Sequence, residues 1–297
     1  MKGIVIAGGE GSRLAPATAT TSKCLLSVYN KPMVYYPLSV LMLAGIRDIL
    51  VISRPRDINA YATHLQDGHQ WGISITYAEQ ENPRGGIGEA FIIGRDFVGD
   101  GPCSLVLGDN LFFGQGLQNR LRGALERHRG ATVFAYQVRD PGKFGVVSFD
   151  EYGQASELIE KPAHPRSNWA VTGLYIYDNS VLDVARDTPP GNRGELEITD
   201  INCHYLQSGM LRVERLGPGF AWFDAGTPDS LLEASHFVRT IERRQHQSCA
   251  VPEEIAFQNG WIDQAQLQRL GQDIRRSDYG RYLVRLAEGK ALAGSWE

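Results

Sequence analysis

Residues 3–16 read Gly-Ile-Val-Ile-Ala-Gly-Gly-Glu-Gly-Ser-Arg-Leu-Ala-Pro. The apolar start of this stretch, Gly3–Ala7, predicts a buried strand, and a cluster of glycines follows at once. Glycines in this place let backbone N–H groups approach phosphate oxygens, although a tight turn would also need them for positive φ. Arg13 and Lys23 add two cations, which favour a phosphate-binding loop over a plain turn.

The loop matches neither of the two common nucleotide-binding fingerprints. A P-loop ends in Gly-Lys-Ser or Gly-Lys-Thr, whereas Ser12 and Arg13 follow the last glycine here. The Rossmann pattern needs a third glycine where Leu14 stands, which disfavours a nicotinamide-dependent reductase acting on a sugar nucleotide. Pro16 argues against a long helix directly after the glycines. We therefore expect an extended loop that wraps a phosphate chain.

Apolar runs of strand length recur along the chain, with helical patterns between several of them. The runs are Gly3–Ala7, Asp48–Ser53, Ser74–Ala78, Cys103–Leu107, Ala131–Val138, Val146–Phe149, Ala170–Tyr177 and Leu211–Leu216. One helix is expected to open at Pro37 and close at Gly45, and another to cover Gly116–His128. This alternation predicts an α/β fold whose largely parallel sheet is covered by helices, with the active site beyond the carboxyl ends of the strands.

Beyond Asp224 the pattern is helical. Thr227 is a helix cap, and Pro228 follows it at the first helical position. Apolar residues then recur at helical spacing. Three short helices are expected after that, at Glu253–Gln258, Gln264–Leu270 and Tyr279–Ala287. We expect a catalytic core at 1–240 and a helical extension at 241–297, which either makes subunit contacts or simply covers the sheet.

Composition excludes several classes of protein. The chain has 297 residues, of which 42% are hydrophobic and 22% charged, and its net charge of −4 argues against a nucleic-acid partner. No apolar run is long enough to span a bilayer, and none has the form of a secretory signal. The four cysteines are scattered without metal-ligand spacing, so we expect free thiols in the cytoplasm: Cys24, Cys103, Cys203 and Cys249.

Strings along the whole chain resemble the sugar nucleotidyltransferase family, and within it most closely the glucose-1-phosphate thymidylyltransferases. The glycine stretch followed by Ser22-Lys23 resembles the family signature. Further matching strings are Lys31–Ser39, Leu41–Arg47, Val106–Asn110, Glu160–Pro162, Val171–Tyr175, Arg193–Asp200 and Pro252–Ala256. The resemblance implies a Rossmann-like, three-layer α/β nucleotidyltransferase fold, with a mostly parallel mixed central sheet and a C-terminal helical appendage.

The resemblance also implies a reaction. A sugar 1-phosphate attacks the α-phosphorus of a nucleoside triphosphate in line, and pyrophosphate leaves; for this group the substrates are dTTP and glucose 1-phosphate. The nucleophile is already an anion, so the catalyst needs positioned cations and a metal rather than a general base. Arg13 and Lys23 match the positions that hold the triphosphate, and Lys161 matches the lysine that meets the sugar phosphate.

Two aspartates are candidates for binding Mg²⁺. Asp109 follows the strand Cys103–Leu107, and Asp224 follows the apolar run Phe220–Phe223. Mg²⁺ takes one or two protein carboxylates together with phosphate oxygens, which two aspartates from distant segments can satisfy. A turn residue at Asp109 and a helix-capping role near Thr227 for Asp224 are the alternatives.

The remaining candidate positions follow from the resemblance. The nucleotide set is Ala7, Gly8, Gly9, Gly11, Ser12, Gln80, Gly85 and Gly86, and the sugar set is Asn110, Gly145, Glu160, Val171 and Tyr175. A carboxylate that accepts from two hydroxyls suits a hexose, and an amide that donates and accepts together suits thymine. The resemblance further implies a homotetramer, with a second site between subunits where a dTDP-sugar gives feedback inhibition.

The chain departs from the family pattern around the base. The loop from Gln80 to Ala90 is one residue longer than the usual form, and Glu89 replaces an amide by a group that only accepts hydrogen bonds. Ala225 stands in an Asp-Ala-Gly sequence where Asp-Thr-Gly is usual. UTP and another sugar 1-phosphate therefore stay open as substrates, and so does a non-catalytic regulatory or binding protein with the same fold.

Overall fold

A computed structural model describes residues 1–82, 84–127, 129–191, 193–245 and 248–290 of the chain. Its main sheet has nine strands within these residues. They are β1 (Lys2–Ile6), β4 (Asp48–Ser53), β5 (Ser74–Glu79), β6 (Cys103–Leu107), β8 (Ala131–Gln137), β9 (Gly145–Phe149), β10 (Ala155–Glu160), β11 (Trp169–Tyr177) and β12 (Leu211–Leu216). Each of the eight expected runs is a strand within one or two residues of its predicted bounds.

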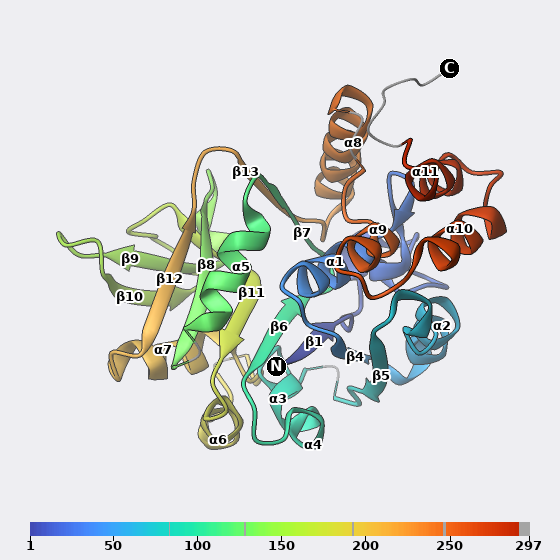
Figure 1. Ribbon diagram of the computed structural model, residues 1–297. Coiled ribbons are helices and arrows are strands. Elements are labelled where there is room, and N and C mark those ends of the chain that lie inside the picture. Colours follow the sequence, from blue (N-terminus) through green and yellow to red (C-terminus); the bar gives the residue numbers. More distant parts are fainter. Residues whose placement is uncertain (83, 128, 192, 246–247, 291–297) are drawn as a thin grey trace.

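The sheet is mixed, with a parallel half that starts at the N-terminus. The order β10-β9-β11-β6-β1-β4-β5 forms the main path, and β8 lies against β11 and β12 off that path. Strands β1, β4, β5 and β6 run parallel to one another, whereas β11 is antiparallel to β6, β8 and β9. This arrangement confirms the mostly parallel mixed sheet (Figure 1).

Alternation along each strand divides the apolar residues between two cores. On β1, Val5 packs into the cluster that also holds α1 (Tyr35–Leu43), and Ile4 packs into the opposite cluster. The second cluster includes α7 (Ile198–Gln207) and its neighbours on the lower side of the sheet in Figure 1. Because strand side chains alternate between faces, a sheet buried on both faces needs a helical layer on each. The three layers are therefore confirmed.

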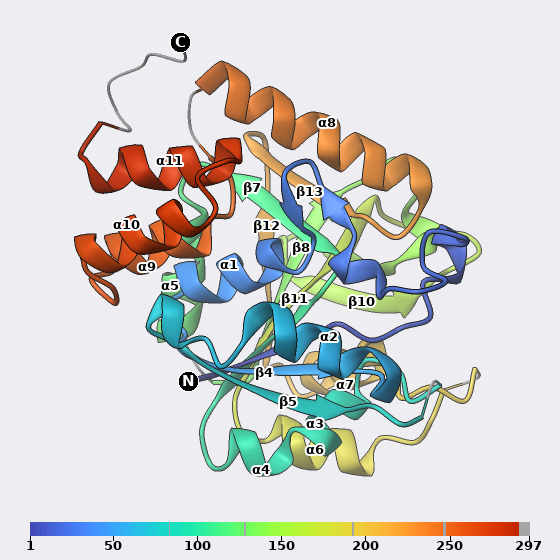
Figure 2. The ribbon, with the colours of Figure 1, turned by 90° about the vertical axis from the view of Figure 1, so that its right-hand side faces the viewer.

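The other helices distribute over these two layers. They are α2 (Pro55–Leu65), α3 (Glu89–Ile93), α4 (Arg95–Val98), α5 (Leu117–Glu126), α6 (Val181–Asp187), α8 (Pro228–Gln245), α9 (Pro252–Gln258), α10 (Gln264–Asp273) and α11 (Asp278–Ala287). In Figure 1, α3, α4, α6 and α7 lie below the sheet. The last three helices, which the sequence predicts, pack against one another beside α1 (Figure 2).

Helix α1 begins earlier than the proline predicts. It starts at Tyr35, so Pro37 lies inside the first turn, where a missing N–H leaves no intrahelical bond unmade. The expected start at Pro37 is therefore wrong by two residues. Gly45 has a φ of 87° and ends the helix as expected. The helix α5 begins after Gly116 and ends at Glu126, and the expected end at His128 lies outside the described residues.

Four short strands form two small ribbons away from the main sheet. One ribbon pairs β7 (Asn110–Gly114) with β13 (Phe220–Asp224), and the other pairs β2 (Ser27–Val28) with β3 (Lys31–Pro32). The first ribbon continues from the end of β6, so it carries the chain across the carboxyl edge of the sheet. The proposed boundary at residue 240 falls inside α8, which runs unbroken from Pro228 to Gln245.

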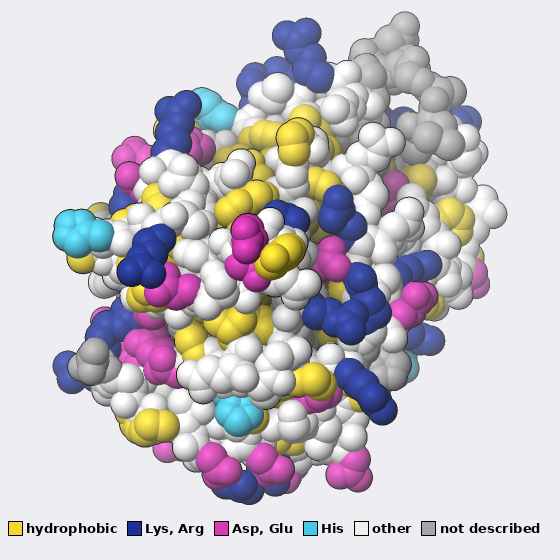
Figure 3. Space-filling view, turned by 90° about the vertical axis from the view of Figure 1, so that its left-hand side faces the viewer, with side chains coloured by type: hydrophobic (Ala, Val, Ile, Leu, Met, Phe, Trp, Pro, Cys, Tyr) yellow, Lys and Arg dark blue, Asp and Glu magenta, His cyan; other side chains and the backbone are white. Residues whose placement is uncertain are grey.

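Surface character agrees with the modest net charge. On the face drawn in Figure 3, basic and acidic side chains are interspersed among apolar and neutral ones, without a broad field of one sign. None of the described helices combines the length and apolar character that crossing a membrane requires. The four cysteines are unpaired thiols, and three of them are buried.

Candidate active site

The glycine stretch forms a loop at the carboxyl end of β1. Gly9 and Gly11 have φ values of 90° and 61°, which residues with side chains rarely adopt. A single turn of 3-10 helix, Ser12–Leu14, follows, so the expectation that no long helix starts here is confirmed. A Cβ on Gly11 would lie 3.2 Å from the Cβ of Lys23, which places the lysine directly against the loop.

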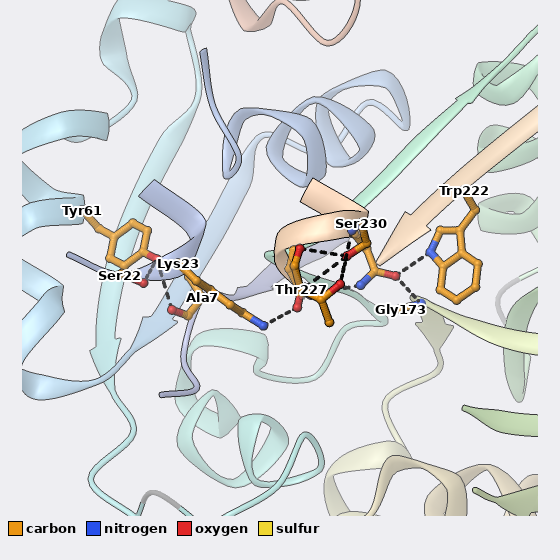
Figure 4. A network of polar contacts seen from close by, with 10 residues as sticks. Ala7, Ser22, Lys23, Tyr61, Gly173, Trp222, Thr227 and Ser230 are labelled. Carbon is orange, nitrogen blue, oxygen red and sulfur yellow. Dashed lines mark hydrogen bonds and ion pairs between the residues drawn. The ribbon is translucent and has the colours of Figure 1, made fainter. Parts of the chain in front are cut away.

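Buried hydroxyls fix the start of this loop. The Ala7 carbonyl accepts from the Tyr61 hydroxyl at 3.1 Å and from the Ser53 hydroxyl at 3.2 Å. The Tyr61 oxygen lies 2.6 Å from the Ser22 oxygen, next to Lys23 in the chain, as Figure 4 shows. The Tyr61 hydroxyl thus connects the start of the glycine loop with the segment that contains Lys23. Ala7 is fully buried, and its carbonyl is engaged within the protein.

The two predicted metal ligands come together through the ribbon β7–β13. Asp109 lies between β6 and β7, and Asp224 is the last residue of β13. The antiparallel register sets Asp224 opposite Asn110, and the Ala225 N–H donates to the Asp109 carbonyl at 2.9 Å. Two segments more than a hundred positions apart therefore meet at the carboxyl edge of the sheet, where the sequence predicts the site.

Charges at this edge are strongly coupled. The Lys23 ammonium donates to the Asp109 carboxylate, and both side chains are mostly buried. Burial opposes charge on either partner, but their attraction outweighs it, so the pKa of Lys23 is raised and the pKa of Asp109 is lowered. Burial and the negative charge of Asp109 raise the pKa of Asp224 to about 6.

Arg13 completes a group of four charged residues. A Cβ on Gly226 would lie 2.7 Å from the Arg13 Nη2 and 3.1 Å from the Asp224 Oδ1, so the guanidinium lies beside that carboxylate. The positive charge of Arg13 also lowers the pKa of Asp224 against the larger effects of burial and Asp109. The structure thus brings Arg13, Lys23, Asp109 and Asp224 together.

The acid pair has the chemistry that a hard divalent cation needs. Mg²⁺ binds through one or two carboxylates and completes its shell with water and phosphate oxygens. The raised pKa of Asp224 shows that its charge is opposed by burial and by Asp109, a conflict that a cation between them would relieve. No cluster of three or more acidic, histidine or cysteine ligands occurs among the described residues, so a bound ion would depend on substrate oxygens.

Asn110 connects the acid pair with β11. Its Nδ2 donates to Asp109 at 3.0 Å, while its Oδ1 accepts from the Gly173 N–H at 3.0 Å and from the Trp222 indole at 2.6 Å (Figure 4). Asn110 is 2% exposed, so in the structure it orients Asp109. The predicted sugar contact of Asn110 stays a prediction.

Three of the predicted sugar residues lie together on adjacent strands. A Cβ on Gly145 would lie 3.4 Å from the Glu160 Oε2 and 3.9 Å from the Val171 Cβ. The Thr199 hydroxyl donates to the same Glu160 oxygen at 2.6 Å and fixes the carboxylate from α7. Tyr175 follows on β11; burial and the charge of Glu160 raise its pKa. These residues lie around the Glu160 carboxylate.

Lys161 lies at the sugar end of the site and not at the acid pair. Its ammonium is 3.2 Å from Glu160 and its side chain is 45% exposed. Its φ is 43°, an unusual value for a residue with a side chain, and its N–H donates to the Phe144 carbonyl. Such a conformation persists only where the surrounding structure fixes the backbone, so the position of Lys161 is constrained.

The predicted base contacts form a third region at the end of β5. The Gln80 amide donates to Glu89 at 2.7 Å and to the Gly86 carbonyl at 3.1 Å. Both amide hydrogens are therefore in use within the protein, and the predicted contact of Gln80 with the base stays a prediction. Gly85 and Gly86 pack on Leu196, and a Cβ on Gly86 would reach within 2.5 Å of the Leu196 carbonyl.

Several residues of the site escaped the sequence reasoning. Trp222 and Tyr61 act through hydrogen bonds to segments far away in the chain. Thr199 and Arg193 lie in a string that carries the resemblance, which was the available signal. The Arg193 guanidinium is 2.7 Å from Glu197 and 3.3 Å from Glu160, so it adds a cation to the sugar end.

Coupled carboxylates with flanking cations, placed beside a glycine loop at the carboxyl edge of a parallel sheet, define a class: α/β enzymes that act on nucleotide phosphates. A profile of the family described as nucleotidyl transferase matches residues 2–241. The chain belongs to the nucleotidyl transferase family, which generally uses a divalent metal ion.

Curated relatives match along nearly the whole chain. A protein of Xanthomonas campestris pv. campestris named glucose-1-phosphate thymidylyltransferase is 54% identical over 291 residues, with 98% of each chain covered. Proteins of the same name from Neisseria meningitidis and Mycobacterium tuberculosis are 53% and 49% identical, covering 96% and 97% of this chain and 99% of each relative. The predicted family and enzyme class are therefore confirmed.

Solved structures agree with the fold. A Bacillus anthracis protein, assigned as a glucose-1-phosphate thymidylyltransferase and crystallised with sucrose, is 39% identical with a TM-score of 0.75, over 80% of this chain and 95% of that one. A UDP-glucose pyrophosphorylase in complex with UDP-glucose is 22% identical with a TM-score of 0.71, over 80% and 98%. The second likeness shows a shared fold alone.

Proposed function

We propose that this protein transfers a thymidylyl group from dTTP to glucose 1-phosphate, giving dTDP-glucose and pyrophosphate. The observation that carries the proposal is the meeting of Arg13, Lys23, Asp109 and Asp224 beside the glycine loop. The relatives' shared name supports the choice of substrates.

In this reaction a sugar-phosphate oxygen forms a bond to the α-phosphorus while the bond to the pyrophosphate oxygen breaks. The attacking group is already ionised, so no residue has to remove a proton. The difficulty is to hold two polyanions together and to stabilise the charge that develops on the leaving pyrophosphate. We assign that work to positioned cations.

Each cation has a place suited to one anion. Arg13 lies beside the glycine loop, and its planar fork suits the oxygens of the triphosphate. Lys23 is held next to Asp109, from which its ammonium can reach a phosphate in the loop. Lys161, beside Glu160, is assigned to the phosphate of the sugar. Lys23 is mostly buried, which makes its charge more effective than it would be in water.

We assign Asp109 and Asp224 as ligands of Mg²⁺. When bound, the ion would supply Lewis-acid neutralisation of phosphate charge. Asn110 keeps the Asp109 carboxylate oriented for that role.

Sugar and base lie on opposite sides of the phosphates in this assignment. Glu160 accepts from two hexose hydroxyls beside Gly145, Val171 and Tyr175, and Thr199 fixes its carboxylate. Glycines 8, 9, 11 and Ser12 follow the triphosphate, and Gln80 meets the base with the backbone of Gly85 and Gly86.

We further propose a homotetramer that a dTDP-sugar inhibits at a second site. A cavity of about 620 Å³ supports this second site. It lies away from the acid pair, between α1, β7 and the helices α8 and α9, where Phe113, Gly116 and Glu254 contribute to its wall. We retain the division into a core at 1–240 and an extension at 241–297, supported by the end of the family match at residue 241.

A matrix of nucleoside triphosphates against sugar 1-phosphates, read by pyrophosphate release with Mg²⁺, tests the proposal. We expect dTTP with glucose 1-phosphate to give the highest kcat/KM. A higher kcat/KM with UTP or with another sugar 1-phosphate would change the assigned substrates but not the assigned reaction. No release with any pair would contradict the proposal and favour a regulatory or binding protein.

A further inference from the structure

The hydroxyl of Tyr61 lies where two segments of the candidate active site meet. Tyr61 belongs to α2, which contains none of the predicted site residues, and its side chain is fully buried. Its oxygen lies 3.1 Å from the Ala7 carbonyl oxygen, at the start of the glycine loop (Figure 4). The same oxygen lies 2.6 Å from the Ser22 Oγ, one residue before Lys23. A side chain from outside the site therefore contacts both segments at once.

The chemistry of the three groups fixes the direction of both hydrogen bonds. A carbonyl oxygen only accepts, so the single hydrogen of the Tyr61 hydroxyl is directed to Ala7. The Ser22 hydroxyl then donates to the Tyr61 oxygen. Tyr61 thus serves one segment as a donor and the other as an acceptor. Phenylalanine has the same ring and can do neither.

A third segment of the site packs against the same place. The Tyr61 hydroxyl also contacts the Cys24 thiol, which is fully buried. A Cβ on Gly108 would lie 2.8 Å from the Cys24 Sγ, so the thiol packs against the residue that precedes Asp109. Lys23 and the aspartate to which it donates are therefore both positioned from this buried cluster.

Resting on the proposed function, we propose that Tyr61 is a positioning residue for the triphosphate. Its hydroxyl sets the place of Lys23 relative to the glycine loop, and both of these meet the phosphates in the assigned reaction. Because Tyr61 is fully buried, it acts through these segments and does not touch the substrate. The sugar end is held separately, since Thr199 on α7 fixes Glu160. Stabilisation of phosphate charge depends on preorganised geometry, so a shift of the cation weakens it.

Tyr61→Phe removes the hydroxyl and keeps the ring. The buried Ser22 hydroxyl then loses the partner that it has in the structure, so its segment shifts toward another partner and Lys23 shifts with it. Calorimetry with Mg²⁺ measures the dissociation constant of dTTP, which we expect to rise at least about fivefold, the effect of one lost neutral hydrogen bond. We expect the KM for glucose 1-phosphate, measured by pyrophosphate release, to stay unchanged. A general loss of structure would raise both constants.

Tyr177→Phe is the matched control. Tyr177 is also fully buried, and its hydroxyl donates to the Asn202 Oδ1 at 2.6 Å. It pairs with Cys103 at the start of β6, whereas Asp109 follows the end of that strand. We expect Tyr177→Phe to keep the dTTP affinity of the unmodified protein. An unchanged dTTP affinity in Tyr61→Phe, an equal loss in Tyr177→Phe, or a proportional rise in the KM for glucose 1-phosphate overturns the proposal.

Ser22→Ala tests the same contact with a smaller change. Ser22 is 1% exposed, so its hydroxyl is engaged within the protein. We expect Ser22→Ala to weaken dTTP binding when it is made alone and to have no further effect in Tyr61→Phe, where the contact is already broken. No loss in Ser22→Ala, or losses that add fully in the double variant, overturns the proposal. Binding is measured without turnover, so it is separate from the pyrophosphate matrix, whose failure contradicts the proposed function alone.

Discussion

At the scale of single residues, the site depends on charges that the fold forces together. Asp109 and Lys23 neutralise each other, while Asp224 keeps a charge that its surroundings oppose. Ionisable groups whose pKa values are shifted by burial and by a specific charged neighbour cluster at functional sites.

Removing the Asp109 carboxylate should abolish most of the activity. We expect Asp109→Asn to lower kcat at least 100-fold, because it removes a proposed metal ligand and the partner of Lys23. Pyrophosphate release measures the rate, and far-ultraviolet circular dichroism should show an intact fold. Asp100→Asn, at an exposed position, is the control and should keep the normal rate. A near-normal rate in Asp109→Asn means that the metal assignment is wrong.

Truncating Arg13 should also slow the reaction. A charged donor in a dry phosphate site contributes about 2–4 kcal/mol to the transition state. We therefore expect Arg13→Ala to lower kcat/KM for dTTP roughly 30- to 1000-fold. Arg212→Ala, an exposed arginine on β12, should leave it unchanged. Equal values for the two variants would show that Arg13 does not act on the triphosphate.

The charged residues of the site could be predicted, whereas most of their supports could not. Arg13, Lys23 and Asp109 belong to motifs with local spacing, so a single sequence displays them. The contact from Trp222 to Asn110 exists only because β13 pairs with β7 in one register. The register cannot be predicted from the local sequence of either strand, because the pairing of distant strands depends on the whole fold.

At the scale of elements, the ribbon β7–β13 is one part of the fold that the sequence does not predict. The run at Asn110–Gly114 follows β6 with only Gly108 and Asp109 between them, so it looks like an overrun of one strand. Runs such as Asp48–Ser53 were found with their true bounds because turn residues or helices flank them on both sides.

The indole of Trp222 should matter to the rate through the ribbon. It donates to Asn110, which orients Asp109. We expect Trp222→Phe to lower kcat about fivefold with little change in KM, since one neutral hydrogen bond contributes about 1 kcal/mol. Trp169→Phe, on β11, is the control and should retain kcat. An unchanged kcat in Trp222→Phe would show that Gly173 alone holds Asn110 in place.

The contact between α9 and α11 should make stability depend on pH. Burial raises the pKa of Glu253 above its ordinary value of 4.5, although the Tyr279 hydroxyl donates to it at 2.5 Å and Lys31 lies near. The folded protein therefore holds this proton more tightly than the unfolded chain. The associated stability is present below pH 4.5 and is lost as the pH rises through the raised pKa.

Glu253→Gln removes this dependence. We expect the variant to become more stable relative to the unmodified protein as the pH rises: the difference in the free energy of unfolding, variant minus unmodified protein, should increase from pH 5 to pH 8. Urea unfolding at several pH values measures it, with the exposed Glu151→Gln as a control. A difference that stays constant with pH contradicts the expected burial of charge at Glu253.

At the scale of the whole molecule, a buried ion pair joins the core to the helix that follows the active site. Lys31 of β3 and Glu242 of α8 lie 3.0 Å apart, and burial lowers the pKa of Lys31 despite this partner. Glu242 also accepts from the Asn30 side chain at 2.9 Å and from the Cys249 N–H at 3.0 Å.

Breaking this pair should destabilise the protein strongly. We expect Glu242→Ala to lower the free energy of unfolding by about 3–5 kcal/mol, because it leaves a buried ammonium without a counter-charge. Glu233→Ala, at an exposed position of α8, should change it by less than about 1 kcal/mol. Denaturant unfolding compares them. In the double variant Lys31→Met/Glu242→Leu much of the loss should be recovered; a loss equal to that of Glu242→Ala contradicts this account.

Helix α8 has one more consequence. It starts four residues after Asp224 and ends beside the cavity wall, and its 18 residues span about 27 Å. The helix runs unbroken over that length (Figure 2), and Lys31 contacts Glu242 near its C-terminal end. We therefore expect a ligand in the cavity to affect the residues before the N-terminal end of α8, and amide hydrogen exchange at Ala225 and Gly226 should slow when a ligand binds there. If a ligand in the cavity leaves the exchange rates of Ala225 and Gly226 unchanged, the two ends of α8 move independently.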